Sequence, residues 1–219
     1  MPTIIAFHGP ASVGKSTAAK QMESALWEEA IIRGESFEVQ MLSLADLLKH
    51  QTRELFGLTG PEWDGPFYGP SAFRNTPLSF ELRAAPHVKT VRGLLEFIGT
   101  DVFRNQVDPD HWTRGVDRMI RNTTRWVIVP DLRFDSEAAW LRNYPSHYLG
   151  HLRFGRPREP QSCHACEKGL SPGMLEKFYE AGRLFRHIRE DGPPAQTIPA
   201  QREAIREAAR VIVNQGRFE

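Results

Sequence analysis

A glycine-rich loop near the N-terminus carries the residues with the clearest chemistry. After an apolar run at 3–7, the chain has Gly9, four further residues, and then Gly14-Lys15-Ser16. With this spacing the backbone N–H groups of the loop can turn inward, and the loop leads into a helix whose N-terminus attracts anions. The sequence therefore predicts a loop that wraps a phosphate group.

The side chains of this loop predict a nucleotide and a metal ion. Lys15 is expected to reach the β- and γ-phosphates of a nucleotide, and the Ser16 hydroxyl is expected to ligate Mg²⁺. ATP and Mg²⁺ are therefore the expected cofactors. The predicted ATP-binding residues are Gly9, Ala11, Ser12, Val13, Gly14, Lys15, Ser16 and Thr17.

A second polar site follows the apolar run of the segment VIVPDLRF. Asp131 is placed at the C-terminal end of a predicted buried strand, where a carboxylate can face the metal ion of a phosphate loop. The alternative is an aspartate that caps the next helix. Arg133, two residues later, is predicted to meet a phosphate, and its alternative role is that of a surface arginine.

Strands and helices are predicted to alternate around these residues, which indicates a parallel sheet with right-handed crossovers and helices on both faces. Strands are predicted at 3–7, 37–42, 125–134 and 146–154, and helices at 15–33, 44–55, 90–102, 108–120 and 135–143. Towards the C-terminus the pattern predicts a helix at 174–190, a break at 191–199, a helix at 201–210 and a last strand at 210–214.

Composition limits the classes of function. A chain of 219 residues with 40% hydrophobic residues suits a single domain. The net charge of +1 gives no basic field for tight non-specific DNA binding, so the expected partner is a small molecule. No apolar run is long enough to span a membrane, and a signal peptide is not indicated. The cysteines, Cys163 and Cys166, suit a reducing compartment, and with only His164 beside them they do not make a structural zinc site.

Several ordered segments resemble a known family, the bacteriophage-type deoxynucleoside monophosphate kinases, which are related to dephospho-coenzyme A kinase and the nucleoside monophosphate kinases. The segments are HGPASVGKST, LSLADLLK, TVRGLLEFIGTDVFRNQVDPDHW, VIVPDLRFDSEA, HLR followed by HACE, and VIVNQG. In the third segment the family pattern is met by Thr90, Arg92, Gly99, Thr100, Asp101 and Arg104. The chain departs from the pattern at Cys166, where the family commonly has serine, and at Pro130 before Asp131.

The resemblance implies an α/β P-loop kinase fold, with a central parallel sheet of about five strands and helices on both faces. It implies one domain, 1–219, with an acceptor-binding insertion at 58–92 and a lid at 154–173. A deoxynucleoside monophosphate would face ATP, and arginines would hold its phosphate, because an acceptor that is already ionised needs charge neutralisation more than a base. The implied location is the cytoplasm of a phage-infected bacterial cell, and a homodimer is left open.

The implied site has three groups of residues. The catalytic group is Lys15, Asp131, Arg133 and Arg153. The acceptor-binding group is Asp46, Lys49, Trp63, Arg92, Arg104, Arg133 and Glu167. The metal ligands are Ser16 and Asp131.

Simpler roles for these residues stay open at this point. Each arginine is an equally good surface residue, and Asp46 can serve only as a first-turn carboxylate on a helix dipole. The aromatic residues of the insertion can stack on a base or anchor the loop to the core. These aromatic residues are Trp63, Phe67, Tyr68 and Phe73.

Two other functions compete with the monophosphate kinase. In the first, the same machinery phosphorylates a hydroxyl group, such as that of a hydroxymethylated pyrimidine in phage DNA, and Asp46 or another carboxylate acts as the base. In the second, the protein only binds a nucleoside triphosphate. The many arginines and aromatic residues outside the phosphate loop favour a kinase with an acceptor.

Overall fold

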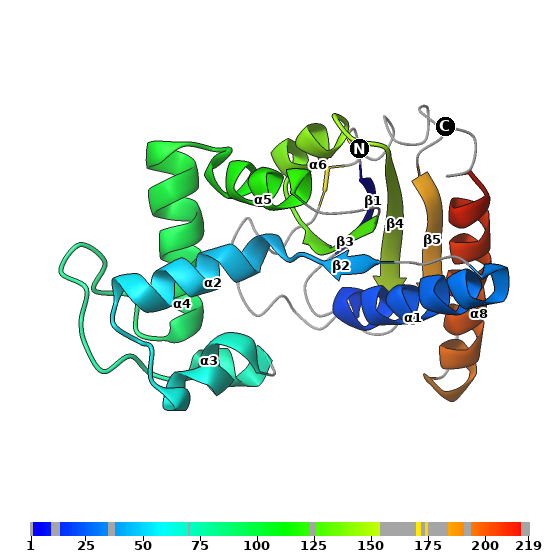
Figure 1. The fold of residues 1–219 in the computed structure, drawn as a ribbon. Helices are drawn as coiled ribbons and strands as arrows, with labels where there is room; N and C mark the ends of the chain where they lie inside the picture. The colour runs from blue at the N-terminus through cyan, green and yellow to red at the C-terminus, as the bar shows by residue number, and fades with distance from the viewer. Residues whose placement is uncertain are drawn as a thin grey trace. The chain divides into compact units, whose positions relative to one another are not determined.

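The computed structural model of the protein divides into two compact units (Figure 1). The sheet unit comprises Met1–Ser43 and Asp117–Glu219, and the helical unit comprises Leu44–Val116. The residues that the structure describes are 2–9, 14–34, 38–69, 71–122, 126–153, 170–171, 174, 184–190 and 194–215.

The sheet unit is built on parallel strands. In the described part of the chain the strand order is β2-β3-β1-β4-β5, and each neighbouring pair is parallel. The prediction of a mixed α/β fold with a parallel sheet is therefore confirmed. The strands are β1 (Thr3–His8), β2 (Val39–Met41), β3 (Trp126–Leu132), β4 (Ser146–Arg153) and β5 (Leu184–Glu190).

Both faces of the central strands are buried, as expected for a parallel sheet. One face packs against α1 (Lys15–Arg33) and α8 (Pro194–Gln215) through a continuous apolar cluster. The residues of β1 and β3 that point to the opposite face, such as Ile4 and Val127, are equally inaccessible. Right-handed crossovers place α6 (Asp135–Leu141) on that second face, because the crossover from β3 to β4 runs opposite to the one from β1 to β2.

The C-terminal part differs from the sequence-based prediction. The segment Leu184–Glu190, which we expected to end a helix, is strand β5 and pairs with β4. The single helix α8 covers 194–199 of the predicted break, the predicted helix 201–210 and the predicted last strand, whereas 191–193 lie outside the described residues. The β-branched residues at 211–213 suggested a strand, but Ile212 and Val213 continue the buried face of Ile205 and Ala209 at helical spacing.

The helical unit packs around its own apolar core. Its longest regular helix, α2 (Leu44–Leu55), precedes a run of short elements, and Thr90 caps α4 by accepting a hydrogen bond from the Gly93 N–H at 3.2 Å. Helix α5 (His111–Arg121) begins in this unit and ends in the sheet unit. The other elements are η1 (Pro61–Trp63), α3 (Asp64–Tyr68), η2 (Ser71–Asn75), α4 (Val91–Glu96) and η3 (Phe97–Val107).

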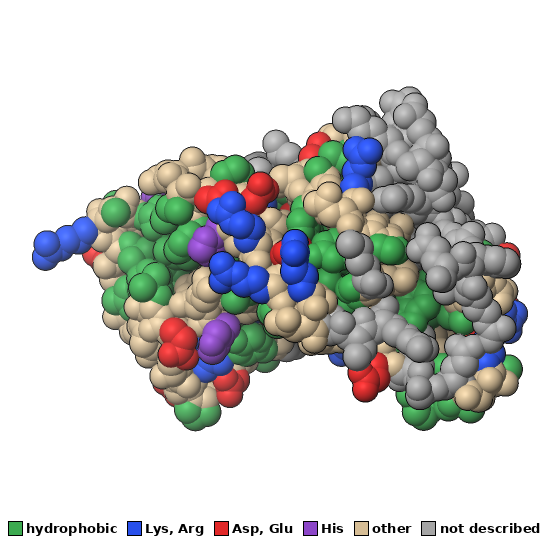
Figure 2. Space-filling view, turned by 45° about the horizontal axis from the view of Figure 1, so that its top comes forward, with side chains coloured by type: hydrophobic (Ala, Val, Ile, Leu, Met, Phe, Trp, Pro, Cys, Tyr) green, Lys and Arg blue, Asp and Glu red, His purple; other side chains and the backbone are tan. Residues whose placement is uncertain are grey.

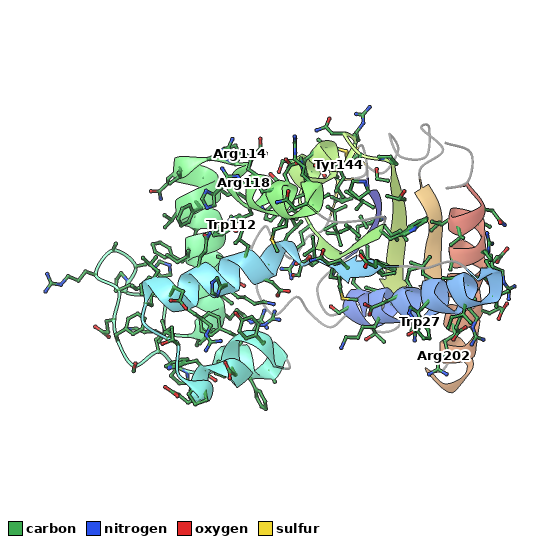
Figure 3. The ribbon with its side chains drawn as sticks, in the orientation of Figure 1. Trp27, Trp112, Arg114, Arg118, Tyr144 and Arg202 are labelled. Atoms are coloured by element: carbon green, nitrogen blue, oxygen red, sulfur yellow. The ribbon has the colours of Figure 1, made fainter. Side chains whose placement is uncertain are left out.

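The segment with the most specific family motif forms a π-helix, η3. Its widened turn is closed by a hydrogen bond from the Asp108 N–H to the Phe103 carbonyl, five residues earlier, at 2.7 Å. A Cβ atom at Gly99 would lie 2.6 Å from Leu48 Cδ2, so glycine allows α2 to approach closely. The Gly99 carbonyl accepts the indole N–H of Trp112 at 2.9 Å (Figure 3). Because π-helical turns are rare and often occur at functional sites, η3 is a candidate functional element.

The surface carries charges of both signs. On the face drawn in Figure 2, Lys and Arg side chains lie among Asp and Glu side chains. This distribution agrees with the net charge of +1. Among the described helices, none has the length and apolar character needed to cross a membrane.

Candidate functional site

The strand order places the predicted phosphate loop at the centre of the sheet. Strand β1 lies between β3 and β4, and the connections that leave β1 and β3 run in opposite directions. Ligands of open α/β sheets bind at such a point, outside the carboxyl ends of the strands. The segments after β1 and β3 are therefore the expected ligand-binding segments of this unit.

The glycines of the loop adopt backbone conformations that other residues avoid. Gly9 has φ 145° and Gly14 has φ 99°. Gly14 is the N-cap of α1 and offers no side-chain hydrogen bond, and the first turn of α1 carries no acidic residue. A helix start without a carboxylate of its own is suited to an external anion.

Lys15, the first residue of α1, is a nearly buried cation. Lys15 is only 8% exposed, and its Nζ donates a hydrogen bond to the Gly9 carbonyl at 2.8 Å. A lysine is rarely so buried unless its ammonium group is paired, and the hydrogen bond to the Gly9 carbonyl meets this requirement. Ser16 and Thr17 follow in the exposed first turn of α1. Ala11, Ser12 and Val13 lie outside the described residues.

Asp131 stands at a β-bulge in β3. Between Ala6 and His8 strand β1 advances by two residues while β3 advances by three, from Val129 to Leu132. Pro130 lies in this extra length and has no N–H to give to the ladder, which accounts for the bulge. The departure from the family pattern at this position therefore has a structural consequence, since bulges re-aim neighbouring side chains.

The carboxylate of Asp131 is nearly buried and held in place. Its Oδ2 accepts a hydrogen bond from Ser43 Oγ at 2.7 Å, and Ser43 follows β2. Strand β2 is hydrogen-bonded to β3 on the side away from β1. A carboxylate oriented by a neighbouring hydroxyl is suited to bind a cation.

Glu137 is a buried residue beside the predicted site that our sequence analysis missed. It is buried in α6, and its Oε2 accepts hydrogen bonds from the backbone N–H groups of Arg133 at 2.8 Å and Phe134 at 3.1 Å. This contact fixes the turn that carries Arg133. The signal was present in the sequence, because a glutamate three residues after the N-cap is typical of a capping box.

Among the predicted metal ligands, the donor set suits Mg²⁺. Asp131 supplies a carboxylate and Ser16 a hydroxyl, both hard oxygen donors from the sheet unit. Among the described residues no group of three or more His, Cys, Asp or Glu side chains could hold a metal ion. Mg²⁺ is usually bound by one or two carboxylates together with phosphates and water, so the two residues fit its requirements.

The predicted acceptor residues lie mainly in the helical unit, where several of them form an ion pair or a hydrogen bond. Asp46 Oδ1 and Lys49 Nζ form an ion pair at 2.6 Å on α2. Arg92 Nε donates to Asn75 Oδ1 at 3.4 Å, and Arg104 Nη1 donates to the Pro109 carbonyl at 3.3 Å. The structure brings Asp46 and Lys49 together.

Other predicted site residues have different surroundings. Trp63 packs against the apolar core of the helical unit. Arg133 belongs to the sheet unit, whereas Arg92 and Arg104 belong to the helical unit, so their convergence stays a prediction. Arg153 is the last residue of β4, and its side chain is outside the described part of the structure. Glu167 and most of the predicted lid, 154–169, also lie outside the described residues.

One family model matches the chain over residues 78–178, and its description is deoxynucleotide monophosphate kinase. The matched segment contains Arg92 and Arg104 as well as Asp131 and Arg133. No curated protein sequence matches the chain. The family match confirms the predicted resemblance and the predicted enzyme class: the chain is similar to the deoxynucleotide monophosphate kinases, and it is a nucleotide kinase.

Proposed function

We propose that the protein transfers the γ-phosphoryl group of ATP, in the presence of Mg²⁺, to the phosphate of a deoxynucleoside monophosphate and so produces the diphosphate. The observation that carries this proposal is the geometry of the loop after β1. Two glycines with positive φ, an N-terminus without a side-chain cap and the nearly buried Lys15 together form a site suited to phosphate. The family segment at 78–178 supports the choice of acceptor.

The loop residues would bind and orient ATP. Backbone N–H groups at the start of α1 would donate to phosphate oxygens, and Lys15 would exchange its hydrogen bond with the Gly9 carbonyl for one with a phosphate. This exchange keeps the ammonium group paired in both states. Charge on the transferring group would thus be stabilised by donors already aimed at it.

The metal ion would be held by Ser16 and Asp131, together with the nucleotide's own phosphates. A Mg²⁺ ion held there would supply positive charge that offsets the negative charge developing on the transferred phosphoryl group. Ser43 would orient the carboxylate of Asp131 through its 2.7 Å hydrogen bond.

The acceptor phosphate would be held by Arg92, Arg104 and Arg133, with Glu167 contributed by the lid. Arg153, at the end of β4, would belong to the catalytic group. A guanidinium group matches the phosphate oxygens through two parallel hydrogen bonds. Glu137 would position Arg133 by fixing the backbone before α6. A general base is unnecessary, because the attacking phosphate oxygen carries negative charge near neutral pH.

The finer organisation of the fold belongs to the same proposal. The chain would be a P-loop kinase with an acceptor-binding insertion at 58–92 and a lid at 154–173. The strand order supports this proposal, since β1, which precedes the predicted phosphate loop, occupies the centre of the sheet. The predicted insertion lies within the helical unit, 44–116.

Phosphoryl transfer to defined acceptors tests this function. The purified protein is incubated with γ-labelled ATP, Mg²⁺ and, separately, each of the four deoxynucleoside monophosphates or DNA that contains hydroxymethylated pyrimidines. We expect a labelled diphosphate from at least one monophosphate and none without Mg²⁺. Label in DNA alone would replace the proposal by the hydroxyl kinase, and the absence of transfer to any acceptor would overturn it.

A further inference from the structure

The aromatic side chains of the predicted insertion differ sharply in exposure. Phe67 is fully buried at 0% exposure, and Trp63 and Phe80 pack against the same core. Tyr68 and Phe73 remain 47% and 54% exposed. An aromatic platform for a ligand must present a free ring face, so these two are the candidates in the described part of the insertion.

Tyr68 differs from Phe73 in having cations against its ring. Lys49 Nζ lies 5.6 Å from the ring centroid and Arg53 Cζ lies 5.3 Å from it. Lys49 and Arg53 are four residues apart on α2 and therefore project from one side of that helix. The ring is thus supported from α2.

A hydrogen bond and an ion pair hold the Arg53 side chain in place beside the Tyr68 ring. Its Nε donates to the Leu58 carbonyl at 2.9 Å, and its Nη1 pairs with Asp64 Oδ1 at 2.9 Å. Burial alone would lower the pKa of Arg53, but hydrogen bonds with Tyr68 and Asp64 raise it above its ordinary value. A ring held in one orientation before a ligand arrives loses little entropy on binding.

A carboxylate is connected to the ring through Lys49. Lys49 contacts the Tyr68 ring and also pairs with Asp46. The Lys49 side chain is 12% exposed, whereas the Asp46 side chain is 56% exposed. The carboxylate is therefore open to an external donor while its cation is covered.

We propose that Tyr68 is the platform on which the base of the acceptor nucleotide stacks, with Asp46 accepting a hydrogen bond from the edge of that base or from its sugar. This inference rests on the proposed function and adds the residue that recognises the base. Stacking on a tyrosine tolerates every base, because each has a π-face. Selection among bases would then come from Asp46 at the edge.

The test compares Tyr68→Leu and Tyr68→Phe in the full-length protein. Tyr68→Leu removes the aromatic face, and we expect the KM for the preferred monophosphate to rise by roughly 10- to 100-fold, with kcat and the KM for ATP close to those of the parent. Tyr68→Phe keeps the ring and should restore most of the affinity. Thermal unfolding of each variant shows whether it is folded, and Trp27→Leu, at an exposed tryptophan of α1, is the matched control.

A ligand that has the sugar and the phosphate but no base distinguishes the loss of base stacking from other effects of the Tyr68→Leu substitution. The inhibition constant of 2-deoxyribose 5-phosphate, measured against the monophosphate, should be the same for the parent and Tyr68→Leu. An equal rise for both ligands would show that Tyr68 does not act through the base and would overturn the inference. It would also be overturned if Tyr68→Leu left KM unchanged or if Phe73→Leu had the larger effect.

These outcomes also separate the inference from the function on which it rests. If the parent phosphorylates a monophosphate and Tyr68→Leu behaves like it, the platform alone is wrong. If the parent phosphorylates no monophosphate, the proposed function and the platform fail together.

Discussion

At the residue scale, the buried charge of Lys15 gives the most direct test of the phosphate loop. Lys15→Ala removes a nearly buried cation that donates a hydrogen bond to the Gly9 carbonyl. We expect kcat to fall by at least about 100-fold, because the lost interaction stabilises charge in the transition state. Circular dichroism should show a folded protein. Lys20→Ala, at an exposed lysine of the same helix, is the control, and a folded Lys15 variant with parental kcat would contradict the assignment.

The metal role of Asp131 can be separated from its structural role. Asp131→Asn keeps an oxygen that can accept the hydrogen bond from Ser43 but removes the charge. The Mg²⁺ concentration for half-maximal activity should therefore increase, whereas binding of ATP without metal should change little. Coincident Mg²⁺ titrations for parent and variant would show that Asp131 acts only within the fold. Glu203→Gln, at an exposed carboxylate of α8, controls for loss of one negative charge.

The residues show where sequence reasoning is reliable. The spacing from Gly9 to Ser16 located a loop whose glycine conformations and lysine contact suit a phosphate, because this chemistry depends on neighbours in the chain. The orientation of Asp131 could not be predicted in the same way. It depends on a bulge and on Ser43, which is 88 residues away in the sequence.

At the element scale, a carboxylate of α5 connects this helix to α6 and to Tyr144, three residues after the end of α6. Asp117 accepts hydrogen bonds from Trp140 Nε1 at 2.9 Å, from Arg121 Nε at 2.6 Å and from the Tyr144 hydroxyl. Burial alone would raise the pKa of Asp117, but the hydrogen bonds from these three side chains outweigh burial and hold the pKa below its ordinary value of 3.8.

This tie predicts a pH-dependent contribution to stability. Because the folded-state pKa of Asp117 is lowered, its contribution is complete above 3.8 and is lost as the pH falls through the folded-state value. Asp117→Asn should lower the free energy of unfolding by about 1 to 3 kcal/mol at pH 7 and at pH 5. The difference from the parent should shrink at pH 3. Urea unfolding at these three pH values measures it, with Asp110→Asn as the control, and a difference that grows on acidification would contradict the prediction.

The bounds of an element were predicted well where the spacing of apolar residues and the residues at the ends of the element indicate the same structure. Helix α1 runs over Lys15–Arg33 as the sequence indicated, with an apolar face and a glycine after its end. The π-helix η3 was missed because apolar spacing does not distinguish hydrogen bonds to the fourth residue from those to the fifth. Strand β5 was missed because its conformation depends on pairing with β4, which local sequence does not record.

At the scale of the whole molecule, each unit carries its own share of the predicted site. The sheet unit contains the phosphate loop with Asp131, and the helical unit contains Asp46 with Arg92 and Arg104. Nucleotide kinases must exclude water from the transferred group, and lids commonly do this only when both substrates are bound. Binding of ATP and binding of the monophosphate should therefore slow hydrogen exchange in different segments of the chain.

Hydrogen exchange of the full chain checks this division. A non-hydrolysable ATP analogue with Mg²⁺ should slow exchange at 14–18, because phosphate oxygens would accept hydrogen bonds from the first N–H groups of α1. A deoxynucleoside monophosphate alone should slow exchange within 44–116. The proposed lid, 154–173, should be protected strongly only by a bisubstrate analogue. The matched deoxynucleoside without phosphate is the control for the second arm. Protection of 14–18 by the monophosphate alone, with 44–116 unchanged, would mean that the two sets of residues have been assigned to the wrong substrates.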